Sequence, residues 1–460
     1  MPALPYNAAP NPHLGAPGIT TMHGDAQASD CTPLPGPGAR PWSVRKTPLG
    51  GACPTVLVGS DNLVQVLCTQ VFSQNLAMLV PKIAILDRWG QELAHLELPK
   101  GALLGGVYAY LDQDNRMVLV DGTNHLIRIA HSPDGRTLWV DSRIDLNRML
   151  ALVPGDQVVG LVPDWQGRVW VASKNGAVGV VDAQRGAIRA TLLRSGATDI
   201  RERIDNSISA SPEGVAVVTS HAIYMLTADE GGAPRVLWSR PYDRGSARKP
   251  GKLAWGSGAS PTFFGPGGAD YVMLTDNADS QENVIIYRAA TGEEVGRAGL
   301  FTPGASGTEN SMIGVGNTVV GANTFGYPYP KYPDGAGPSR PASALFAPGM
   351  ERWDITDRGL RQVWSRPDVY SSAVPRYSNA DNIIYTCERR RGPAGLANGA
   401  YAHAVAIDMD SGATLHAQQL PDHVSILLGG GDTLQMVGTL DRFGTWWQGT
   451  ISGVYRIAAA

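Results

Sequence analysis

The chain has 460 residues, of which 43% are hydrophobic and 17% are charged, and its net charge at pH 7 is −3. This charge does not indicate the basic surface typical of proteins that bind nucleic acid. No apolar run reaches the roughly 18 residues of a membrane-spanning helix. The sequence therefore predicts neither a nucleic-acid partner nor a membrane partner. Its 55 glycines and 33 prolines favour short strands joined by tight turns over helices.

The first 40 residues are rich in Pro and Gly and show no periodicity. This composition predicts an extended or loop-like arm, residues 1–40, ahead of a single domain, residues 41–460. The arm carries a short polar group, His23 and Asp25, with Asp30 just after it. It lacks a basic start followed by an apolar segment, so we expect a cytoplasmic protein, or one exported after removal of a signal.

Two of the four cysteines, Cys53 and Cys68, flank a predicted hairpin whose turn is residues 59–62. A hairpin centred there sets these two cysteines opposite each other, close enough for their side chains to touch. Two interpretations stay open: a pair of packed apolar thiols, or a disulfide, which would indicate an oxidising compartment.

From residue 52 onward, β-branched and apolar runs recur in groups of four strands, with a period of roughly 45 residues. This pattern predicts an all-β fold, a single β-propeller with eight four-stranded blades, or seven if neighbouring short strands are merged. After the first hairpin unit, the groups fall at residues 107–141, 158–193, 207–239, 258–300, 309–366, 372–420 and 424–460.

The last group holds only three strand candidates, at residues 424–428, 433–438 and 453–458. A ring needs a fourth outer strand there, and residues 42–46 are the candidate. Pairing this N-terminal strand with the last blade would close the ring and protect the edge strands.

Three pairs of an acidic residue followed by Asn lie at predicted strand ends. In a propeller, the loops before the inner strands and the loops between the second and third strands share one face, around the channel mouth. Two pairs open inner strands, the third ends a second strand, and His221 lies in another turn between second and third strands. The pairs are Asp205-Asn206, Glu309-Asn310 and Asp276-Asn277.

Two long loops fall on the same predicted face. Residues 324–350 carry Tyr327 and Tyr329 among many Pro and Gly residues, and the second loop spans residues 389–401. Long loops in compact domains are often functional, so both belong to the candidate site.

Three stretches resemble a family of bacterial β-propeller proteins with quinoprotein-like (PQQ-like) repeats. They are residues 257–262 (Ser-Gly-Ala-Ser-Pro-Thr), 275–279 (Thr-Asp-Asn-Ala-Asp) and 308–311 (Thr-Glu-Asn-Ser). The resemblance runs through most of the chain, including the arm with His23, and it implies the propeller fold. The chain lacks two features of quinone-cofactor dehydrogenases, because its tryptophans do not recur at a fixed blade position and no two cysteines are adjacent.

Carboxylates and Asn amides are hard oxygen ligands of the kind that suits Ca²⁺ or another divalent cation. A ring at the channel mouth could hold such an ion, as in propeller lactonases, which are similar in using Glu, Asn and Asp. The metal would polarise a carbonyl or lower the pKa of a water molecule. The candidate ligands are Asp205, Asn206, Asp276, Glu309 and Asn310.

Without a metal, crowded carboxylates and histidines could perform acid–base chemistry on a small-molecule substrate. The favoured function is therefore a hydrolase or lyase at the channel mouth. The alternatives are a quinoprotein-like oxidoreductase and a non-catalytic ligand-binding or scaffold propeller. Candidate catalytic residues are His23, Asp25, Asp276, Glu309 and His221, and candidate substrate-binding residues are Asn277, Tyr327, Tyr329 and Asn206.

Each of these features also has a structural interpretation. An acid–Asn pair at a strand end is often a turn-former that bonds its own backbone. His221 could be a packed turn residue, and the tyrosine-rich loop could be an oligomer contact. The arm residues His23 and Asp25 could be solvated.

Overall fold

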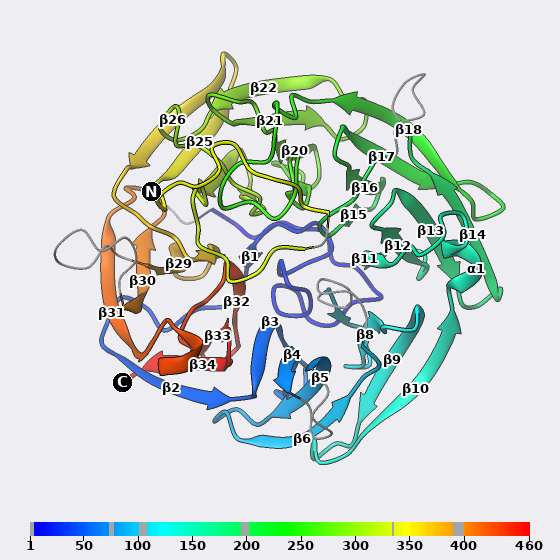
Figure 1. The fold of residues 1–460 in the computed structure, drawn as a ribbon, viewed down its shortest axis with the longest axis horizontal. Coiled ribbons are helices and arrows are strands. Elements are labelled where there is room, and N and C mark those ends of the chain that lie inside the picture. Colours follow the sequence, from blue (N-terminus) through cyan, green and yellow to red (C-terminus); the bar gives the residue numbers. More distant parts are fainter. Residues whose placement is uncertain (1–3, 73–77, 101–107, 195–201, 334, 390–399) are drawn as a thin grey trace.

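The computed structural model describes residues 4–72, 78–100, 108–194, 202–333, 335–389 and 400–460. Eight sheets stand around one axis as the blades of a propeller, which confirms the predicted all-β fold and the predicted blade number (Figure 1). Within each blade the strands run antiparallel from an inner strand near the axis to an outer strand at the rim.

The first four blades follow the chain order without interruption. A single turn of helix, α1 (Asn147–Leu150), links the second blade to the third. Blade one has β3 (Gly51–Val58), β4 (Val64–Phe72), β5 (Met78–Leu86) and β6 (Glu92–Glu97); blade two has β7 (Tyr110–Leu111), β8 (Met117–Val120), β9 (His125–His131) and β10 (Leu138–Asp145); blade three has β11 (Val158–Pro163), β12 (Val169–Ser173), β13 (Ala177–Asp182) and β14 (Ala187–Leu192); blade four has β15 (Ser209–Ser211), β16 (Gly214–Val218), β17 (Ala222–Ala228) and β18 (Pro234–Pro241).

Blades five and six repeat this plan, and the last two blades each add strands from elsewhere in the chain. Blade five has β19 (Thr262–Phe264), β20 (Tyr271–Thr275), β21 (Asn283–Arg288) and β22 (Glu294–Gly299); blade six has β23 (Ile313–Val315), β24 (Thr318–Ala322), β25 (Met350–Thr356) and β26 (Gly359–Arg366); blade seven has β28 (Arg376–Ser378), β29 (Ile383–Glu388), β30 (Tyr401–Asp408) and β31 (Thr414–His423), with β1 (Cys31–Thr32) beside β28; blade eight has β32 (Met436–Leu440), β33 (Trp446–Thr450), β34 (Gly453–Ala459) and β2 (Trp42–Pro48), with β27 (Ala373–Val374) beside β32.

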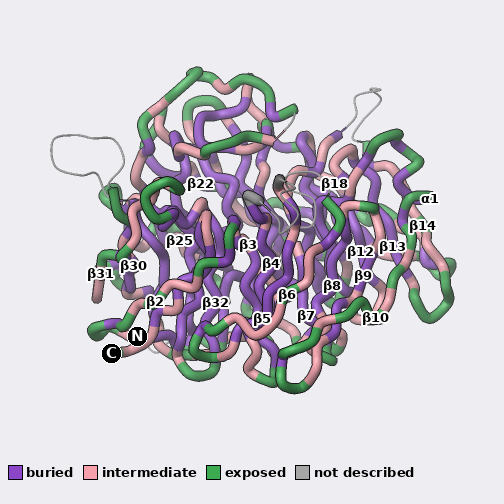
Figure 2. The backbone as a smooth tube through the Cα atoms, turned by 60° about the horizontal axis from the view of Figure 1, so that its bottom comes forward, coloured by how far each residue is buried: buried purple, intermediate pink, exposed green. Residues whose placement is uncertain are grey.

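Burial falls from the axis to the rim. Every residue of β12 is buried, whereas the outer strand β14 of the same blade is mostly half-exposed. A blade is sandwiched between two neighbours, so its middle strands are apolar on both faces and read as continuous hydrophobic runs. The apolar core therefore lies between blades, and the exposed residues gather on the loops at the two faces (Figure 2).

The N-terminal strand closes the ring as predicted. β2 pairs antiparallel with β34 along its whole length, from Trp42 opposite Ala459 to Pro48 opposite Gly453. The first strand after the arm is thus the outermost strand of the last blade, and the ring has no open edge between blade eight and blade one.

The predicted strand at residues 424–428 is wrong. This segment ends in a short 3-10 helix, η2 (Ile426–Leu428), and the third strand of the group is instead β33, which was not predicted and whose Trp446 and Trp447 are fully buried. The three glycines that follow η2, residues 429–431, favour a turn over a strand. The tryptophans bury far more apolar area between blades, so they take the strand position.

The arm is loop-like, as predicted, but it is buried inside the ring, where its dark-blue trace crosses the centre (Figure 1). Its backbone carbonyls accept hydrogen bonds from amides near the carboxyl ends of six inner strands, those of blades one, two, four, five, six and seven. The donor–acceptor pairs are Val58–Ile19, Leu111–Thr20, Ala210–Ala26, Phe263–Gln27, Gly314–Ser29 and Tyr377–Asp30.

The two remaining blades are joined to the arm through side chains. In blade three the inner strand ends at Pro163, which has no N–H, and its carbonyl accepts from the Asn11 side chain at 2.9 Å. In blade eight, the carbonyl of Gly438 accepts from the buried Arg376, which also donates to the carbonyl of Met22. The arm therefore contacts every blade and closes one end of the channel.

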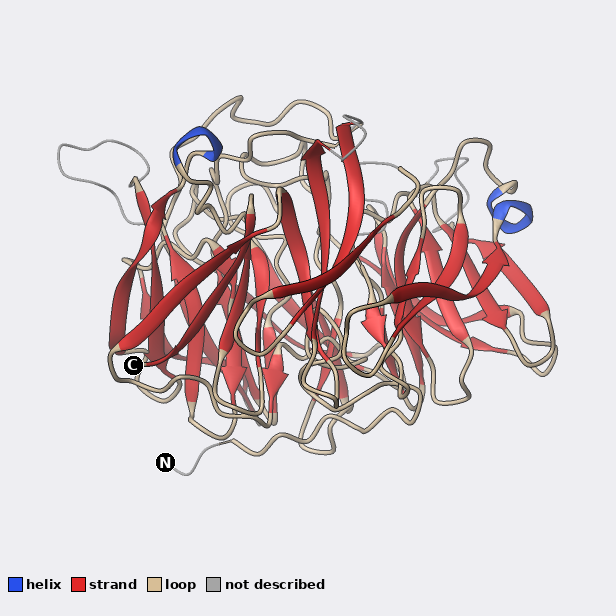
Figure 3. Ribbon diagram, turned by 90° about the horizontal axis from the view of Figure 1, so that it is seen from below, coloured by secondary structure: helices blue, strands red, loops and turns tan. Residues whose placement is uncertain are grey.

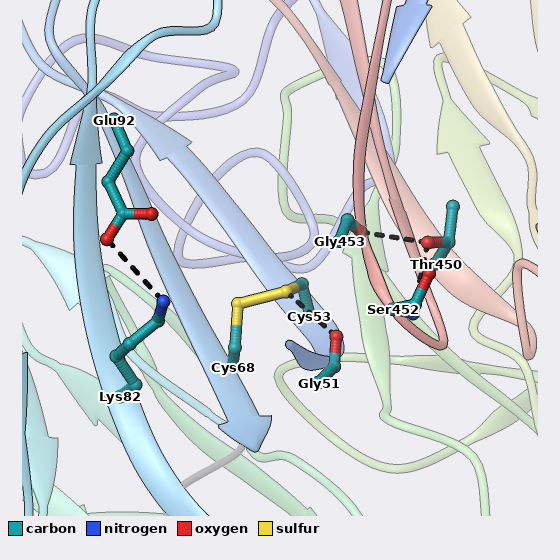
Figure 4. The surroundings of a disulfide bond; sticks show 8 residues. All are labelled: Gly51, Cys53, Cys68, Lys82, Glu92, Thr450, Ser452 and Gly453. Atoms are coloured by element: carbon teal, nitrogen blue, oxygen red, sulfur yellow. Dashed lines mark hydrogen bonds and ion pairs between the residues drawn. A yellow bond between two sulfur atoms is a disulfide. The ribbon is translucent and has the colours of Figure 1, made fainter. Parts of the chain in front are cut away.

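A disulfide joins Cys53 on β3 to Cys68 on β4, with 2.05 Å between the sulfur atoms (Figure 4). The structure thus selects the disulfide over the pair of thiols. The register between these strands shifts between Ala52 and Thr55, and this bulge brings Cys53 opposite Cys68. Cys31 and Cys387 are buried free thiols.

We expect the Cys53–Cys68 crosslink to stabilise the fold by about 2 kcal/mol, because it closes a short loop of the unfolded chain. Denaturing alkylation without reductant should modify two cysteines, Cys31 and Cys387, and alkylation after reduction should modify four. Reductant should lower the urea midpoint of the wild type but not that of a Cys53→Ala/Cys68→Ala variant. Four modified cysteines without reductant would contradict the assignment.

Helices are few and short. Neither α1 nor any other helix in the described parts of the chain has the length and apolar character needed to cross a membrane. The strands leave both faces of the ring to loops, and those loops carry the candidate site (Figure 3).

Candidate functional site

A cavity of about 410 Å³ lies on the axis, on the side of the arm where the inner strands begin. Its floor is formed by Met22 and His23 of the arm. Its walls come from residues just before or at the start of inner strands and from loops between second and third strands. A cavity therefore lies on the predicted face of the propeller, at the predicted central position.

The cavity has two chemically different sides. Its polar side comes from residues that precede the inner strands of blades four and six: Asn206, Glu309, Asn310 and Ser311. Its apolar side comes from blades one and eight, where Ala52, Pro54, Val374, Met436, Val437 and Ile451 line it. A cavity of this size, largely apolar with a few convergent polar groups, is the usual form of a small-molecule site.

The connection between β24 and β25, described at residues 323–333 and 335–349, reaches toward the centre of the ring (Figure 1). Tyr329 and Lys331 of this connection line the cavity. Tyr327 does not, because its buried hydroxyl bonds Asp432, which also accepts from Arg389 at 2.8 Å. Its ring packs 4.9 Å from the ring of Tyr329, so Tyr327 supports the cavity wall from behind.

Glu309 is the cavity's most unusual group. Its side chain is buried, and its Oε2 atom accepts from the backbone N–H of Leu253 at 2.7 Å. Within the described residues, its Oε1 atom is buried and has no hydrogen-bond partner. Burial raises the pKa of Glu309 to about 7, against a smaller lowering by Lys252. A buried titratable group that has one unsatisfied oxygen and lines a cavity is a candidate site for ligand contact or proton transfer.

The Asn of the first acid–Asn pair has a structural role. The Asn206 side chain donates to the carbonyl of Gly258 at 2.5 Å and lies 3.4 Å from the carbonyl of Glu309. Gly258 has φ +67°, and a Cβ atom there would lie 3.2 Å from the Glu309 side chain. The Asn206 amide therefore links the entries of blades four, five and six, and Gly258 leaves room for the carboxyl.

Asn310 extends this linkage across the cavity. Its side-chain amide donates to Gln435 Oε1 at 2.9 Å, and the Gln435 amide donates to the carbonyl of Ser371 at 2.7 Å. Asn310 thus ties blade six to blade eight. Its amide is used for structure as well as for lining the cavity.

His23 lies on the cavity floor and is buried. Its Nδ1 atom is 2.9 Å from Asp30 Oδ1 and 2.9 Å from the Ser311 hydroxyl, which also bonds Asp30 Oδ2. Its Nε2 atom is 3.4 Å from the Ser260 hydroxyl. The structure thus places His23, but not its neighbour Asp25, in the cavity wall.

Asp25 is buried beneath the floor. It accepts from Tyr6 at 3.0 Å and from the backbone N–H of Ser29 at 3.1 Å, and the Ser29 hydroxyl bonds it as well. Burial raises the pKa of Asp25, and these hydrogen bonds oppose the rise. Its role in the structure is to hold the turn of the arm.

Four other predicted site residues also lie outside the cavity lining. Asp276 accepts from the Asn283 backbone and side chain, both at 2.7 Å, and its pKa is raised by burial. The Asn277 side chain donates to two backbone carbonyls, and Asp205 pairs with Arg203 at 2.7 Å. His221 bonds Ser220, and its pKa is lowered, first by burial and then by Arg244.

The predicted metal ring is therefore not gathered. Of its five members, Asn206, Glu309 and Asn310 line the cavity, whereas Asp205 and Asp276 are bonded elsewhere. Across the described ranges, no three His, Cys, Asp or Glu side chains stand close enough to hold a metal ion. Most of the second predicted loop, residues 390–399, lies outside the described residues.

Several residues of the site were not predicted: Tyr108, Ser260, Ser311, Gln435 and Asp30. Tyr108 and Ser311 lie just before inner strands, so their position relative to the strand start was the available signal. Gln435 and Asp30 carry no such signal. The closure of the ring brings Gln435 to the cavity, and the path of the arm brings Asp30 there.

No protein-family model matches the chain. An uncharacterized protein of Archaeoglobus fulgidus is 28% identical over 341 residues, which are 68% of this chain and 65% of that protein. The chain thus spans about 65% of the length of the curated relative it matches.

Two solved dehydrogenase structures are similar in fold. A quinohemoprotein alcohol dehydrogenase from Comamonas testosteroni has a TM-score of 0.62 and 11% identity, covering 98% of this chain and 81% of that one. A europium-containing methanol dehydrogenase has a TM-score of 0.56 and 10% identity, covering 96% and 98%. At these identities the likeness shows the fold, and it confirms the resemblance to quinoprotein propellers at that level.

Proposed function

We propose that this propeller binds a small amphipathic organic molecule in its central cavity, with Glu309 as the group that recognises the polar end. The observation that carries the proposal is the unsatisfied, buried Oε1 atom of Glu309 on the polar side of a largely apolar cavity. A ligand with an apolar body can cover the side formed by blades one and eight. A hydroxyl or amine at its other end can donate to Glu309.

The pKa of about 7 gives Glu309 both protonation states near neutral pH. As a carboxylate it accepts a hydrogen bond or a proton from the ligand, and as an acid it donates one. This range supports acid–base chemistry as well as binding. The comparisons lend no support to a hydrolase or lyase, and the proposal does not depend on either.

Binding is testable with a panel of aryl alcohols and alkyl amines, measured by calorimetry at pH 8. We expect at least one compound to bind, and Glu309→Gln to weaken its binding about tenfold, because a hydrogen bond to a charged group contributes roughly 1.5–3 kcal/mol. Glu213→Gln, on an exposed turn at the opposite face, is the matched control and should bind like the wild type. If no compound binds, or if Glu309→Gln binds all of them equally well, the proposal fails.

A second candidate function, oxidation by a bound quinone, rests on the fold shared with two dehydrogenases. The cavity fits such a cofactor poorly. Quinones of the PQQ class carry several carboxylates, and Lys331 is the single cationic residue among those lining the described cavity, which also contains the carboxyl of Glu309. Gel filtration after incubation with the quinone separates the two candidates, because a retained chromophore would favour the oxidoreductase.

A further inference from the structure

The groups around His23 leave one of its ring nitrogens free to accept a proton. The Ser311 hydroxyl has a single hydrogen, and it bonds a carboxylate oxygen of Asp30, which can only accept. The Ser311 oxygen is then an acceptor toward His23 Nδ1, 2.9 Å away, as is Asp30 Oδ1 at the same distance. Both contacts require the hydrogen of the neutral imidazole to be on Nδ1, so Nε2 carries the lone pair.

The Nε2 atom faces Ser260, whose buried hydroxyl is 3.4 Å away. The Ser260 side chain also acts on Tyr108, whose pKa it lowers against the larger rise caused by burial. Tyr108 and His23 both line the cavity. The charge of Glu309 adds to the rise in the pKa of Tyr108 that burial causes. Tyr108, Ser260 and His23 thus form a group of polar side chains with exchangeable protons beside the cavity.

A second space, of about 30 Å³, is also lined by His23, together with Asp25 and Tyr108. A space of this size can hold one water molecule.

We propose that Tyr108, Ser260, His23 and Asp30 form a proton relay that serves the ligand cavity as a second proton-transfer group, separate from Glu309. The inference rests on the proposed function, because it needs a ligand in the cavity. A ligand hydroxyl gives its proton to the Tyr108 oxygen as the Tyr108 proton passes to Ser260 and the Ser260 proton passes to Nε2. No electrons are exchanged, and Asp30 stabilises the resulting imidazolium.

In this arrangement Tyr108 is the group that contacts the ligand, and Asp30 is a positioning residue that fixes the tautomer of His23. Asp30 has φ +54°, a conformation that Asn also adopts readily. Asp30→Asn therefore removes the charge with little change in backbone strain, and Ser260→Ala removes the middle hydroxyl of the relay.

The first test needs no ligand. In ¹⁵N-histidine-labelled full-length protein, with His23 assigned through His23→Gln, we expect a neutral ring protonated at Nδ1 and unprotonated at Nε2. Ser260→Ala should shift the Nε2 resonance more than the Nδ1 resonance. A ring protonated at Nε2 would overturn the relay, whether or not any ligand binds.

The second test uses 2-naphthol, which becomes strongly acidic when excited and emits as naphtholate only if an acceptor takes its proton. In Glu309→Gln, we expect bound naphthol still to emit as naphtholate, through the relay. Adding His23→Gln should lower the naphtholate-to-naphthol emission ratio at least about tenfold, the usual scale of one acid–base group. Adding Ser260→Ala to Glu309→Gln should also lower the ratio. This variant replaces His23→Gln in the test if His23→Gln fails to fold.

The matched control is Glu309→Gln/His221→Gln, because His221 lies on the same face but outside the cavity. It should keep the ratio of Glu309→Gln. An unchanged ratio in Glu309→Gln/His23→Gln, with the probe still bound by its anisotropy, overturns the relay alone. Absence of binding in the wild type counts against the proposed function instead, and the tautomer measurement then decides the relay.

Discussion

Deletion of residues 1–33 is expected to prevent folding of the propeller, although it removes no strand from the sequence of four-stranded repeats. Six inner-strand amides would lose the carbonyls of the arm, and the buried side chain of Ile19 would leave blade one. At about 1 kcal/mol net for each hydrogen bond, the loss approaches the 5–15 kcal/mol that stabilises a typical protein. We expect the truncated chain to be recovered aggregated or without cooperative unfolding.

The control for this deletion is removal of residues 1–5, which removes the Leu4 carbonyl that accepts from the Asn379 side chain but keeps Ile19 and the six carbonyls of the arm. This shorter deletion should leave the urea unfolding midpoint close to that of the wild type. A synthetic peptide of residues 1–33, added during refolding of the truncated chain, should restore part of the native circular dichroism. A truncated chain that unfolds like the wild type would show that the arm does not hold the ring together.

Glu309→Gln is expected to stabilise the protein at alkaline pH and to leave its stability unchanged at acidic pH. The folded-state pKa of Glu309 is raised from 4.5 to about 7 by burial, so the folded state holds this proton more tightly than the unfolded chain. The wild type therefore loses stability as the pH rises from about 4.5 to 7, by about 3 kcal/mol for a shift of this size. Gln is neutral throughout and keeps an oxygen for the N–H of Leu253.

Urea unfolding at pH 4 and pH 8.5 measures this difference. The free energies of unfolding of the two proteins should agree at pH 4, below the unfolded-state pKa, and the variant should exceed the wild type by about 3 kcal/mol at pH 8.5. Glu213→Gln, an exposed residue, should follow the wild type at both values. A variant that is less stable at pH 8.5 would mean that the carboxylate is compensated in the folded protein and that Glu309 is not held near its neutral form.

The propeller was predictable because its signal is repeated. Short buried strands separated by turns recur along the whole chain, so an error in one unit, such as residues 424–428, does not change the blade number. The closing strand was predictable for the same reason, since a unit one strand short implies a partner elsewhere. Its counterpart, β2, is the strand-like segment that directly follows the arm.

The candidate site was only partly predictable, because the same face of a propeller includes positions at very different distances from the axis. Asp276 and His221 occupy turns between second and third strands, away from the axis, and neither reaches the cavity. Asp205 and Asn206 are adjacent, but the bend ahead of β15 gives their side chains different partners. Asn206 faces the cavity, and Asp205 faces Arg203.

The order of residues determined the repeat, the closing strand and the end of the ring at which Glu309 and Asn206 would lie, since local periodicity encodes strand positions. The path of the arm depends on single hydrogen bonds to strands up to 354 residues away in the chain, as from Met22 to Arg376, and these leave no local pattern. The pKa of Glu309, the tautomer of His23 and the cavity itself arise only when eight blades and the arm exclude water together. They were therefore decided by the tertiary structure.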